Sequence, residues 1–403
     1  MGIKPNKIFY FFALAVAGKG ISGGDRIFIE FARRWSRVGY INLFTSYEGT
    51  RLLKSQNLSG KNIRINSINN RKFLGSFLFN YLYKIISGVR LGFSLRLPKE
   101  ENIYLYSVSE FWMDSLPVII LKLRYPKVSW IAAWYETAPN PLIGYREGER
   151  KESYRLSAFY FWLMQLPIKP AISSFADFVL INNEEEKKQF PKHNTRGKAI
   201  VVLGAVDLEK IGKWKKAHAK FAKKYDAVFQ GRFHPQKGVV ELIEIWRKVV
   251  NRKPSAKLAM IGDGPLMRNV KLKIKNLKLE RNIELFGYVF DGSQKYKIFS
   301  QSKIVVHPAF FDSGGMAAAE AMAFGLPCVG FNLKSFKSYY PQGMVKVEIG
   351  DLKAFAGEIV RLLDDTSYYQ KIAQEALEMI QSNWSWEKRA KDIFAFVSFK
   401  FII

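Results

Sequence analysis

The chain is poor in cysteine and histidine. Its 403 residues include one cysteine, Cys328, and four histidines. A single cysteine excludes an intramolecular disulfide and is typical of a protein from a reducing compartment. No apolar run reaches the roughly 18 residues that a membrane-spanning helix needs, so we expect no transmembrane segment.

Acidic residues are also scarce. The 35 Asp and Glu residues stand against 63 Lys and Arg residues, which gives a formal net charge of +28. Such a charge attracts anionic partners: nucleic acid, phosphorylated metabolites or an acidic membrane face. With 48% hydrophobic residues the chain can bury substantial cores, and its length suits two domains of ordinary size.

The N-terminal segment allows two interpretations. Lys4 and Lys7, the apolar run 8–17 and Gly18 resemble the three regions of a secretory signal peptide. The same run also fits a buried first β-strand. We favour the strand, because the pattern continues without a break through a glycine loop and an amphipathic helix into a second strand at 39–44.

Strand-like and helix-like segments alternate along the chain in two blocks. Such alternation predicts parallel sheets covered by helices. We therefore expect an α/β protein with two doubly wound, Rossmann-like domains, residues 1–207 and 208–380. Residues 210–224 contain seven lysines, and we interpret them as an interdomain linker and domain edge with a solvated charged face.

The segment 231–238, GRFHPQKG, follows a predicted strand and precedes a predicted helix. Arg232 and Lys237 are therefore expected at the carboxyl end of that strand. An arginine can fork onto phosphate oxygens while a lysine adds a point charge beside it. The segment predicts an anion-binding corner, with two solvated cations as the alternative.

The segment 310–327, FFDSGGMAAAEAMAFGLP, places one acid, Glu320, inside an alanine-rich helix. We expect this helix to be about ten residues long, with Asp312 or Ser313 as its N-cap and Gly325 as its stop. The free amides at such a helix N-terminus and the two glycines before it admit an anion. A tight turn with a solvated acid is the alternative.

The motifs and their order resemble the retaining glycosyltransferases of family 4, which have the GT-B fold. The likeness covers nearly the whole chain: SGGDR, VVLGAVD, GRFHPQKG, IGDGP, LFGYV and HPAFFDSGGMAAAEAMAFGLPCVG follow in the family order. SNWSWEKRA resembles the family's final helix, expected at about 381–403, which packs back on the first domain. The resemblance implies two Rossmann-like domains that face a central cleft.

The resemblance also implies roles for individual residues. The family's two glutamates, separated by seven residues, correspond to Asp312 and Glu320, the first replaced by aspartate. Glu320 would accept from ribose hydroxyls, Asp312 would face the donor sugar, and Arg232 and Lys237 would hold the diphosphate. The other positions expected against the donor are mostly backbone sites: Gly231, Gly262, Gly287, Tyr288, Val289, Ser313, Gly314, Gly315 and Met316.

The acceptor side is expected in the first domain. A glycine loop there would face the acceptor or the diphosphate: Ser22, Gly23, Gly24 and Asp25. Some family members carry a histidine near the reacting carbon, but the matching stretch here, 132–141, has none. Glu136 is the substitute candidate, and His193 is expected to be a surface residue.

We therefore predict a hexosyltransferase-type enzyme (EC 2.4) that moves a sugar from a nucleotide-diphosphate sugar to a lipid-linked acceptor or a cell-surface glycan precursor. We expect it to need no metal or other cofactor, because two cations already neutralise the diphosphate. The alternatives are a GT-B sugar-nucleotide epimerase and a basic nucleic-acid-binding protein. No recognised nucleic-acid-binding module supports the latter.

Two basic, aromatic stretches predict where this enzyme works. Residues 51–99 contain ten Lys or Arg and no acid, with an apolar helix face at 73–86, and residues 154–169 again have aromatics and no acid. Basic aromatic helices lie in the interface of anionic membranes. We expect a peripheral enzyme on the cytoplasmic face of the cell membrane, held there by cations that include Lys72, Lys84 and Arg90. The alternative is that both helices pack on the first sheet.

Overall fold

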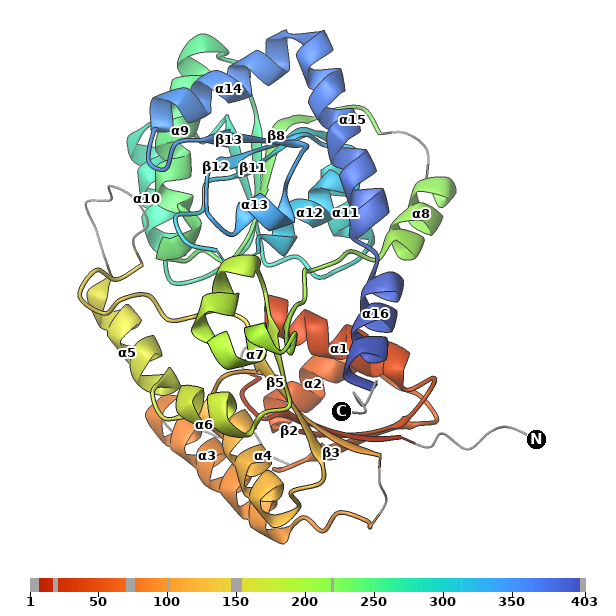
Figure 1. The fold of residues 1–403 in the computed structure, drawn as a ribbon. Coiled ribbons are helices and arrows are strands. Elements are labelled where there is room, and N and C mark those ends of the chain that lie inside the picture. The colour runs from red at the N-terminus through yellow and green to blue at the C-terminus, as the bar shows by residue number, and fades with distance from the viewer. Residues whose placement is uncertain are drawn as a thin grey trace. The chain divides into compact units, whose positions relative to one another are not determined.

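The structure is a computed structural model (Figure 1) that describes residues 7–16, 21–69, 77–99, 102–145, 154–218, 221–312 and 314–398. Its contacts group the chain into two compact units, each of which is α/β. The first unit consists of Met1–Ala138, Phe159–Val202 and Glu387–Ile403, and the second of Pro139–Ala158 and Leu203–Trp386.

These limits differ from the predicted domain boundaries. The division falls between Val202 and Leu203, whereas the sequence predicts it after residue 207. Pro139–Ala158 groups with the second unit, where the ring of Tyr145 lies 5.7 Å from that of His234. At the C-terminus, the part that groups with the first unit begins at Glu387 and not at 381.

The first unit is built on a seven-stranded parallel sheet in the order β3-β2-β1-β4-β5-β6-β7. Its strands are β1 (Ile8–Ala13), β2 (Tyr40–Thr45), β3 (Ile63–Ser67), β4 (Ile103–Ser107), β5 (Ser129–Trp134), β6 (Phe178–Ile181) and β7 (Ala199–Val201). Its helices are α1 (Gly23–Trp35), α2 (Tyr47–Ser55), α3 (Phe77–Ser94), α4 (Trp112–Arg124), α6 (Ile168–Phe175), the 3₁₀ helix η1 (Glu184–Gln189) and α7 (Pro191–Thr195).

Two helices begin in the second unit and continue into the first: α5 (Arg155–Gln165) and α16 (Trp386–Ser398). Within the first unit α16 packs on α1. The indole Nε1 of Trp35 donates to the carbonyl of Ala390 at 2.9 Å, and Arg34 pairs with Glu387 at 3.1 Å. The C-terminal segment thus completes the first unit.

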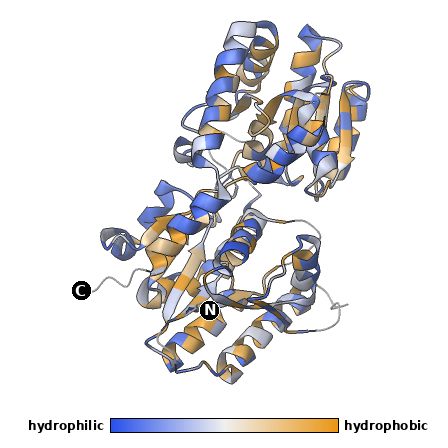
Figure 2. Cartoon of the chain, turned by 90° about the vertical axis from the view of Figure 1, so that its right-hand side faces the viewer, coloured by the Kyte–Doolittle hydropathy of each residue, from blue (hydrophilic) through white to orange (hydrophobic). Residues whose placement is uncertain are grey.

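The apolar N-terminal run forms β1, so the strand interpretation is confirmed. This strand pairs with β2 on one side and with β4 on the other, so it lies inside the sheet. The side chains of Phe9, Phe11 and Phe12 are fully buried. Figure 2 shows hydrophobic residues concentrated along the strands, which is the expected pattern for parallel sheets that are covered on both faces.

The second unit is built on a six-stranded parallel sheet in the order β10-β9-β8-β11-β12-β13. Its strands are β8 (Tyr225–Gln230), β9 (Leu258–Ile261), β10 (Ile283–Gly287), β11 (Ser302–His307), β12 (Cys328–Phe331) and β13 (Met344–Val347). Its helices are α8 (Leu208–Ala217), the 3₁₀ helix η2 (Pro235–Lys237), α9 (Val239–Arg252), α10 (Met267–Asn276), α11 (Ser293–Ser300), α12 (Met316–Met322), α13 (Phe336–Tyr339), α14 (Leu352–Asp364) and α15 (Thr366–Asn383).

The lysines of residues 210–224 that the structure describes are all exposed, so the solvated charged face is confirmed, but the linker interpretation is wrong for residues 210–217, which are helical. Residues 210–217 lie in α8. Asp207 is the N-cap of this helix, and its side chain accepts a hydrogen bond from the amide of Lys210. Lys215 donates to the carbonyl of Ala323 at 2.8 Å. Lys215 thus reaches a carbonyl oxygen of another element while Lys213 and Lys216 stay exposed, so a lysine-rich segment can be a docked helix.

Each sheet contains one point at which the order of its strands reverses. It lies between β1 and β4 in the first unit and between β8 and β11 in the second. The loops that leave the carboxyl ends of two such neighbouring strands run in opposite directions and leave a crevice between them. Ligands of open α/β sheets bind there. These two switch points are therefore the candidate ligand sites of the two units.

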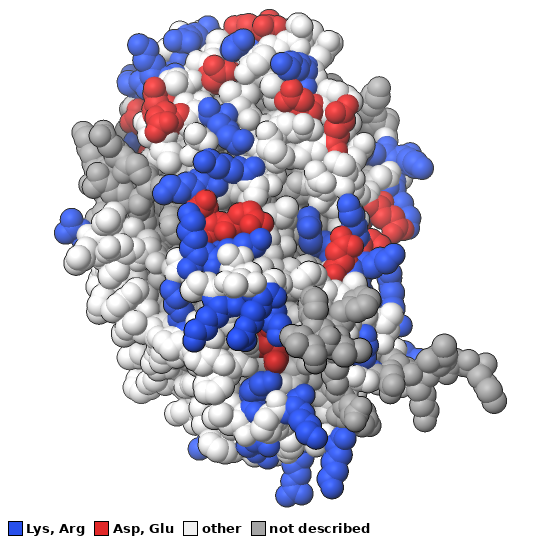
Figure 3. Space-filling model, in the orientation of Figure 1, with Lys and Arg blue, Asp and Glu red and all other residues white. Residues whose placement is uncertain are grey.

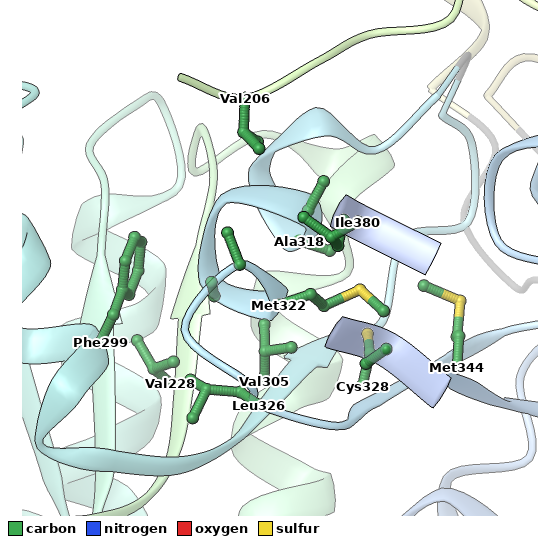
Figure 4. Packing of buried hydrophobic residues seen from close by; sticks show 14 of the residues in the cluster. Val206, Val228, Phe299, Val305, Ala318, Met322, Leu326, Cys328, Met344 and Ile380 are labelled. Carbon is green, nitrogen blue, oxygen red and sulfur yellow. The ribbon is translucent and has the colours of Figure 1, made fainter. Parts of the chain in front are cut away.

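Cys328 begins β12 in the core of the second unit, between Val305 of β11 and Met344 of β13 in the sheet register. Figure 4 shows its thiol among buried hydrophobic side chains that include Met322 and Met344. Burial raises the pKa of this thiol. The only cysteine of the chain is therefore shielded from reagents and held in its unreactive form.

We predict that a thiol reagent labels native Cys328 on the order of a hundredfold or more slowly than the unfolded chain, because labelling requires opening of a packed core. Labelling followed by absorbance across a denaturant series checks this, with Cys328→Ser as the blank. Rapid labelling of one thiol per native chain would show that this core is not packed as described.

Candidate functional site

The second unit has its candidate site at the switch point between β8 and β11. The loop after β8 carries Arg232 and Lys237, and the loop after β11 carries Asp312. Both loops leave the carboxyl edge of the sheet. The predicted position of Arg232 and Lys237 at the carboxyl end of a strand thus agrees with the topology.

Asp312 joins the two loops. Its Oδ2 lies 2.5 Å from the Nζ of Lys237 and 2.9 Å from the Nε2 of His307, at the end of β11. Its Oδ1 accepts from the backbone amides of Gly314 at 3.2 Å and Gly315 at 2.9 Å. Both carboxylate oxygens are therefore engaged within the protein.

The charge state of Asp312 follows from these partners. Burial by itself raises the pKa of the carboxyl, but the charge of Lys237 and the hydrogen bond and charge of His307 outweigh it. The pKa is lowered well below its usual range. A buried carboxylate with a cation and three N–H donors stays ionised, so Asp312 is a fixed negative charge beside Lys237.

The turn before α12 differs from the predicted N-cap. The helix begins at Met316 after Gly315, whose φ of +62° is a left-handed conformation that glycine adopts without strain. Asp312 accepts from amides of this turn and not from the first turn of the helix. Ser313, the other N-cap candidate, lies outside the described residues. The helix has seven residues and not about ten.

Arg232 and Lys237 have different surroundings. The side chain of Lys237 is mostly buried against Asp312, whereas Arg232 is exposed. Within the described ranges no carboxylate forms an ion pair with Arg232. An exposed guanidinium at a switch point is available to an anionic ligand. Lys237 is held beside Asp312 by this ion pair.

Glu320 lies on α12, one turn into the helix. Its Oε2 accepts from the Nζ of Lys295 at 2.5 Å and from the Nε2 of Gln230 at 2.9 Å. Gln230 is the last residue of β8, and Lys295 lies on α11. The predicted contact of Glu320 with ribose hydroxyls remains a prediction, but the acid has protein partners that the sequence did not indicate.

The predicted backbone positions fall into two groups. At Gly262 a Cβ would lie 1.8 Å from the carbonyl oxygen of Gly231, so close packing of two loops requires this glycine. At Gly287, by contrast, a Cβ would meet no described atom within 4 Å, which leaves room for a flat group. Tyr288 is exposed beside it, whereas the side chain of Val289 is buried in the core.

The glycine loop of the first unit opens α1. Ser22 is the N-cap, its Oγ accepts from the amide of Asp25 at 3.1 Å, and its own amide donates to Asp25 Oδ2 at 2.9 Å. The two residues thus form a capping box. Gly23 and Gly24 lie in the first turn, where a Cβ on Gly24 would approach the ring of Tyr135 to 3.2 Å. Capping explains the serine and the aspartate without a ligand, and their predicted acceptor role stays a prediction.

Two buried charges hold the end of β1: Asp114, which the sequence did not single out, and Lys84, which it placed at the membrane surface. Asp114 of α4 accepts from the amides of Leu14 at 2.6 Å and Ala15 at 3.0 Å. Burial raises its pKa to about 7. Lys84 of α3 is also buried, and its Nζ donates to the carbonyl of Val16 at 2.8 Å. The chain is thus fixed up to the start of the glycine loop.

Glu136 lies near two further acids of the first unit. Glu110, just after β4, is buried, and its pKa is raised to about 8, first by burial and further by the charges of Glu136 and Glu186. Glu186 accepts hydrogen bonds from the backbone and the hydroxyl of Thr137. Glu110 lies shortly after β4, and an acid at the end of a predicted strand could have been named as a candidate from the sequence.

His193 is not the surface residue that the sequence predicts. It lies on α7, its side chain is buried, and its Nε2 is 2.9 Å from the carbonyl oxygen of Ala176. This contact gives His193 a structural role.

In the described ranges no group of three or more His, Cys, Asp or Glu side chains is arranged to hold a metal ion. No described helix combines the length and the apolar character that crossing a bilayer requires.

Comparison with known proteins relates part of the second unit to a family. Residues 210–379 match the family described as glycosyl transferases group 1. An uncharacterized glycosyltransferase of Methanocaldococcus jannaschii is 24% identical over 232 residues, 55% of this chain and 53% of that protein. The UDP-Gal:alpha-D-GlcNAc-diphosphoundecaprenol alpha-1,3-galactosyltransferase of Escherichia coli is 28% identical over 140 residues, 34% of this chain and 35% of that protein. The matched parts thus span about half or less of these relatives.

A solved structure shows the same fold over nearly the whole chain. The Anabaena protein HepE, in complex with UDP and glucose, superposes with a TM-score of 0.68 at 14% identity and covers 97% of this chain and 99% of its own. At this identity the likeness shows the fold alone. The prediction of two Rossmann-like units of the GT-B class is confirmed.

We predict that the stability contributed by Glu110 depends on pH. Its native pKa of about 8 lies above its ordinary 4.5, so the native state holds a proton that the unfolded state has lost between these values. This stability is complete below about pH 4.5 and is lost as the pH rises through about 8. Glu110→Gln mimics the neutral acid. The urea midpoint of this variant should therefore increase relative to that of the wild type as the pH rises from about 6 to about 9.

The exposed Glu184 provides the matched control for this measurement in the same unit. The urea midpoint of Glu184→Gln should equal that of the wild type at about pH 6 and at about pH 9. A Glu110→Gln difference that stays constant or shrinks toward alkaline pH would contradict the neutral state of Glu110.

Proposed function

We propose that the chain is a glycosyltransferase that moves a sugar from a nucleotide-diphosphate sugar to an acceptor, because residues 210–379 match the family of glycosyl transferases group 1. The observation that carries the proposal is the position of two cations, Arg232 and Lys237, at the switch point of this same segment. The family match favours this activity over the epimerase and nucleic-acid-binding alternatives.

The two cations suit the leaving group of such a transfer. In the reaction, the bond between the anomeric carbon and the diphosphate oxygen breaks, and a bond from the acceptor oxygen to the same carbon forms. Negative charge develops on the departing nucleoside diphosphate, where Arg232 and Lys237 stabilise it. Asp312 fixes Lys237 in place and does not itself contact the donor in this proposal.

We assign a retaining course that uses no metal. The acceptor attacks from the face that the diphosphate leaves, and the leaving phosphate oxygen takes the acceptor's proton, so atoms and charges balance without a protein base. Glu320 accepts from a ribose hydroxyl of the nucleotide. Gly287 and Tyr288 lie beside the base, where Gly287 leaves open space.

The proposed acceptor is lipid-linked or a cell-surface glycan precursor. The E. coli relative carries diphosphoundecaprenol, a lipid carrier, in its name, which supports an acceptor of this class here. The acceptor would bind at the first unit, near Ser22–Asp25 and the acids around Glu136. These acids follow β4, β5 and β6, and Glu110 after β4 lies next to that unit's own switch point.

We further propose that the enzyme is peripheral on the inner face of the cell membrane. Large apolar side chains are exposed on α3 and on the part of α5 that belongs to the first unit, and we call them the aromatic face: Leu78, Phe79, Leu82, Ile86, Phe93, Phe159, Tyr160, Trp162 and Leu163. The two helices are neighbours, since Tyr160 contributes to the raised pKa of Tyr81. Figure 3 shows few charged side chains over α5, on the left of the view.

The occupant of this face is an anionic lipid bilayer. The net charge of +28 and the basic residues of 51–99 other than Lys84 complement acidic headgroups, while the aromatic face enters the interface. One predicted cation has to be withdrawn, because Lys84 is buried against Val16. Lys72 lies outside the described residues, and Arg90 is exposed on α3.

We predict that Arg232→Ala lowers kcat/KM for the donor by on the order of tenfold, and that adding Lys237→Ala brings the loss to on the order of a hundredfold, since each charge-assisted contact contributes about 1.5–3 kcal/mol. The readout is nucleoside diphosphate released from a panel of uridine, guanosine and adenosine diphosphate sugars. The same turnover should persist with a chelator present.

Arg268→Ala is the matched control, because Arg268 is an exposed arginine on α10 of the same unit. It should leave turnover unchanged. Wild-type turnover in the double variant would refute the diphosphate assignment. Loss of activity with chelator that a divalent metal restores would refute the metal-free course.

We predict that the protein sediments with vesicles that contain phosphatidylglycerol and stays in the supernatant with phosphatidylcholine alone. Phe79→Ser should weaken this binding by on the order of tenfold, because Phe79, 65% exposed, loses its apolar burial in the interface. Arg90→Glu should weaken binding most at low salt.

Leu272→Ser is the control, since Leu272 is equally apolar and 58% exposed but lies on α10 of the second unit. It should bind like the wild type. A wild type that ignores anionic vesicles at low salt would overturn the membrane proposal and favour a soluble acceptor.

A further inference from the structure

Lys295 is a buried cation that the reaction as described so far does not use. It lies on α11, between Asp291 and Glu320, and forms an ion pair with each. Lysines are almost never fully buried unless they are paired. Taking an ammonium group out of water costs several kcal/mol, so two carboxylates at this position indicate a site that is built around the charge.

The geometry directs this charge toward Glu320. Two donors converge on a single oxygen, Oε2: Lys295 Nζ at 2.5 Å and Gln230 Nε2 at 2.9 Å. They come from different elements, α11 and the end of β8. Two fixed donors on one oxygen define where the carboxylate lies and in which direction it points.

The exposed fractions separate the residue that meets a ligand from the residue that holds it. The side chain of Glu320 is 23% exposed, whereas that of Lys295 is 3% exposed. A ligand can therefore touch Glu320 but not Lys295.

We propose that Lys295 is a positioning residue that keeps Glu320 ionised and oriented to accept a hydrogen bond from a sugar hydroxyl of the donor nucleotide. The inference rests on the proposed function, since it assumes that a ribonucleotide binds here. Its consequence is selectivity: Lys295, acting through Glu320, makes the site prefer a ribonucleoside diphosphate to the analogue that lacks the contacted hydroxyl.

Removal of the cation should have a defined effect. In Lys295→Met, Asp291 and Glu320 would share a partly buried region without their common counterion. Like charges so placed repel, so Glu320 turns away from its native position. This removes an oriented anionic acceptor, while the phosphate contacts of Arg232 and Lys237 are left unchanged.

The experiment measures binding of UDP, GDP and ADP, each with its 2′-deoxy and 3′-deoxy analogues, by calorimetry on the full chain. For the tightest of the three, the wild type should prefer the ribose form to one analogue by about tenfold, which corresponds to about 1.4 kcal/mol. In Lys295→Met this preference should fall to within about twofold, with the affinity for the deoxy analogue nearly unchanged.

The double variant tests whether Lys295 acts through Glu320. Glu320→Gln should lose the preference by itself, and adding Lys295→Met should then change nothing further. Lys297→Met is the matched control, because it makes the same substitution at an exposed position of the same helix. It should keep the wild-type preference, and melting temperatures show whether each variant is folded.

Gln230→Leu covers the case in which Lys295→Met does not fold. It removes the other donor to Oε2 without leaving a charge buried, and it should reduce the ribose preference by about threefold. Full preference in that variant, or in a folded Lys295→Met, overturns the inference while sugar transfer stands. A wild type that binds none of the three nucleotides and releases no nucleoside diphosphate overturns the proposed function, and the inference with it.

Discussion

The contact between Asp312 and Lys237 is the constraint on which the site of the second unit depends. It joins the loop after β8 to the loop after β11 across the switch point of the sheet. The same carboxylate accepts from His307 and from the turn amides of Gly314 and Gly315. One buried negative charge therefore sets the position of a lysine, a histidine and the entry to α12, because each would lose its partner if the others moved.

The same principle recurs at two other places. Asp114 and Lys84 fix the backbone after β1, and Lys295 and Gln230 fix Glu320. The buried charges are thus held by groups from two or more elements, which agrees with the cost of burying an unpaired ion. Between these edges the cores are apolar, as the surroundings of Cys328 show in Figure 4.

The order of strands and helices and the candidate cations could be predicted from the sequence, because periodicity and strand-end motifs are local signals. The partners of those residues could not. Asp312 was expected to face the donor sugar, yet both of its oxygens are engaged by protein groups. Lys84 was expected on the surface and is buried. Lys295 lies in a helix with an ordinary amphipathic sequence, and no neighbouring residue indicates that its partner is Glu320.

By itself, the sequence determined which segments are strands and helices, that the sheets are parallel, and which residue types stand at the strand ends. These properties follow from side-chain periodicity, glycine and proline positions and chain length, all of which act over a few residues. Only the tertiary structure decided which charges are buried and with whom they pair. Pairing depends on distances between elements that are far apart in the chain. A lysine is buried only where a carboxylate of another element lies close enough to pair with it, and otherwise it stays in water.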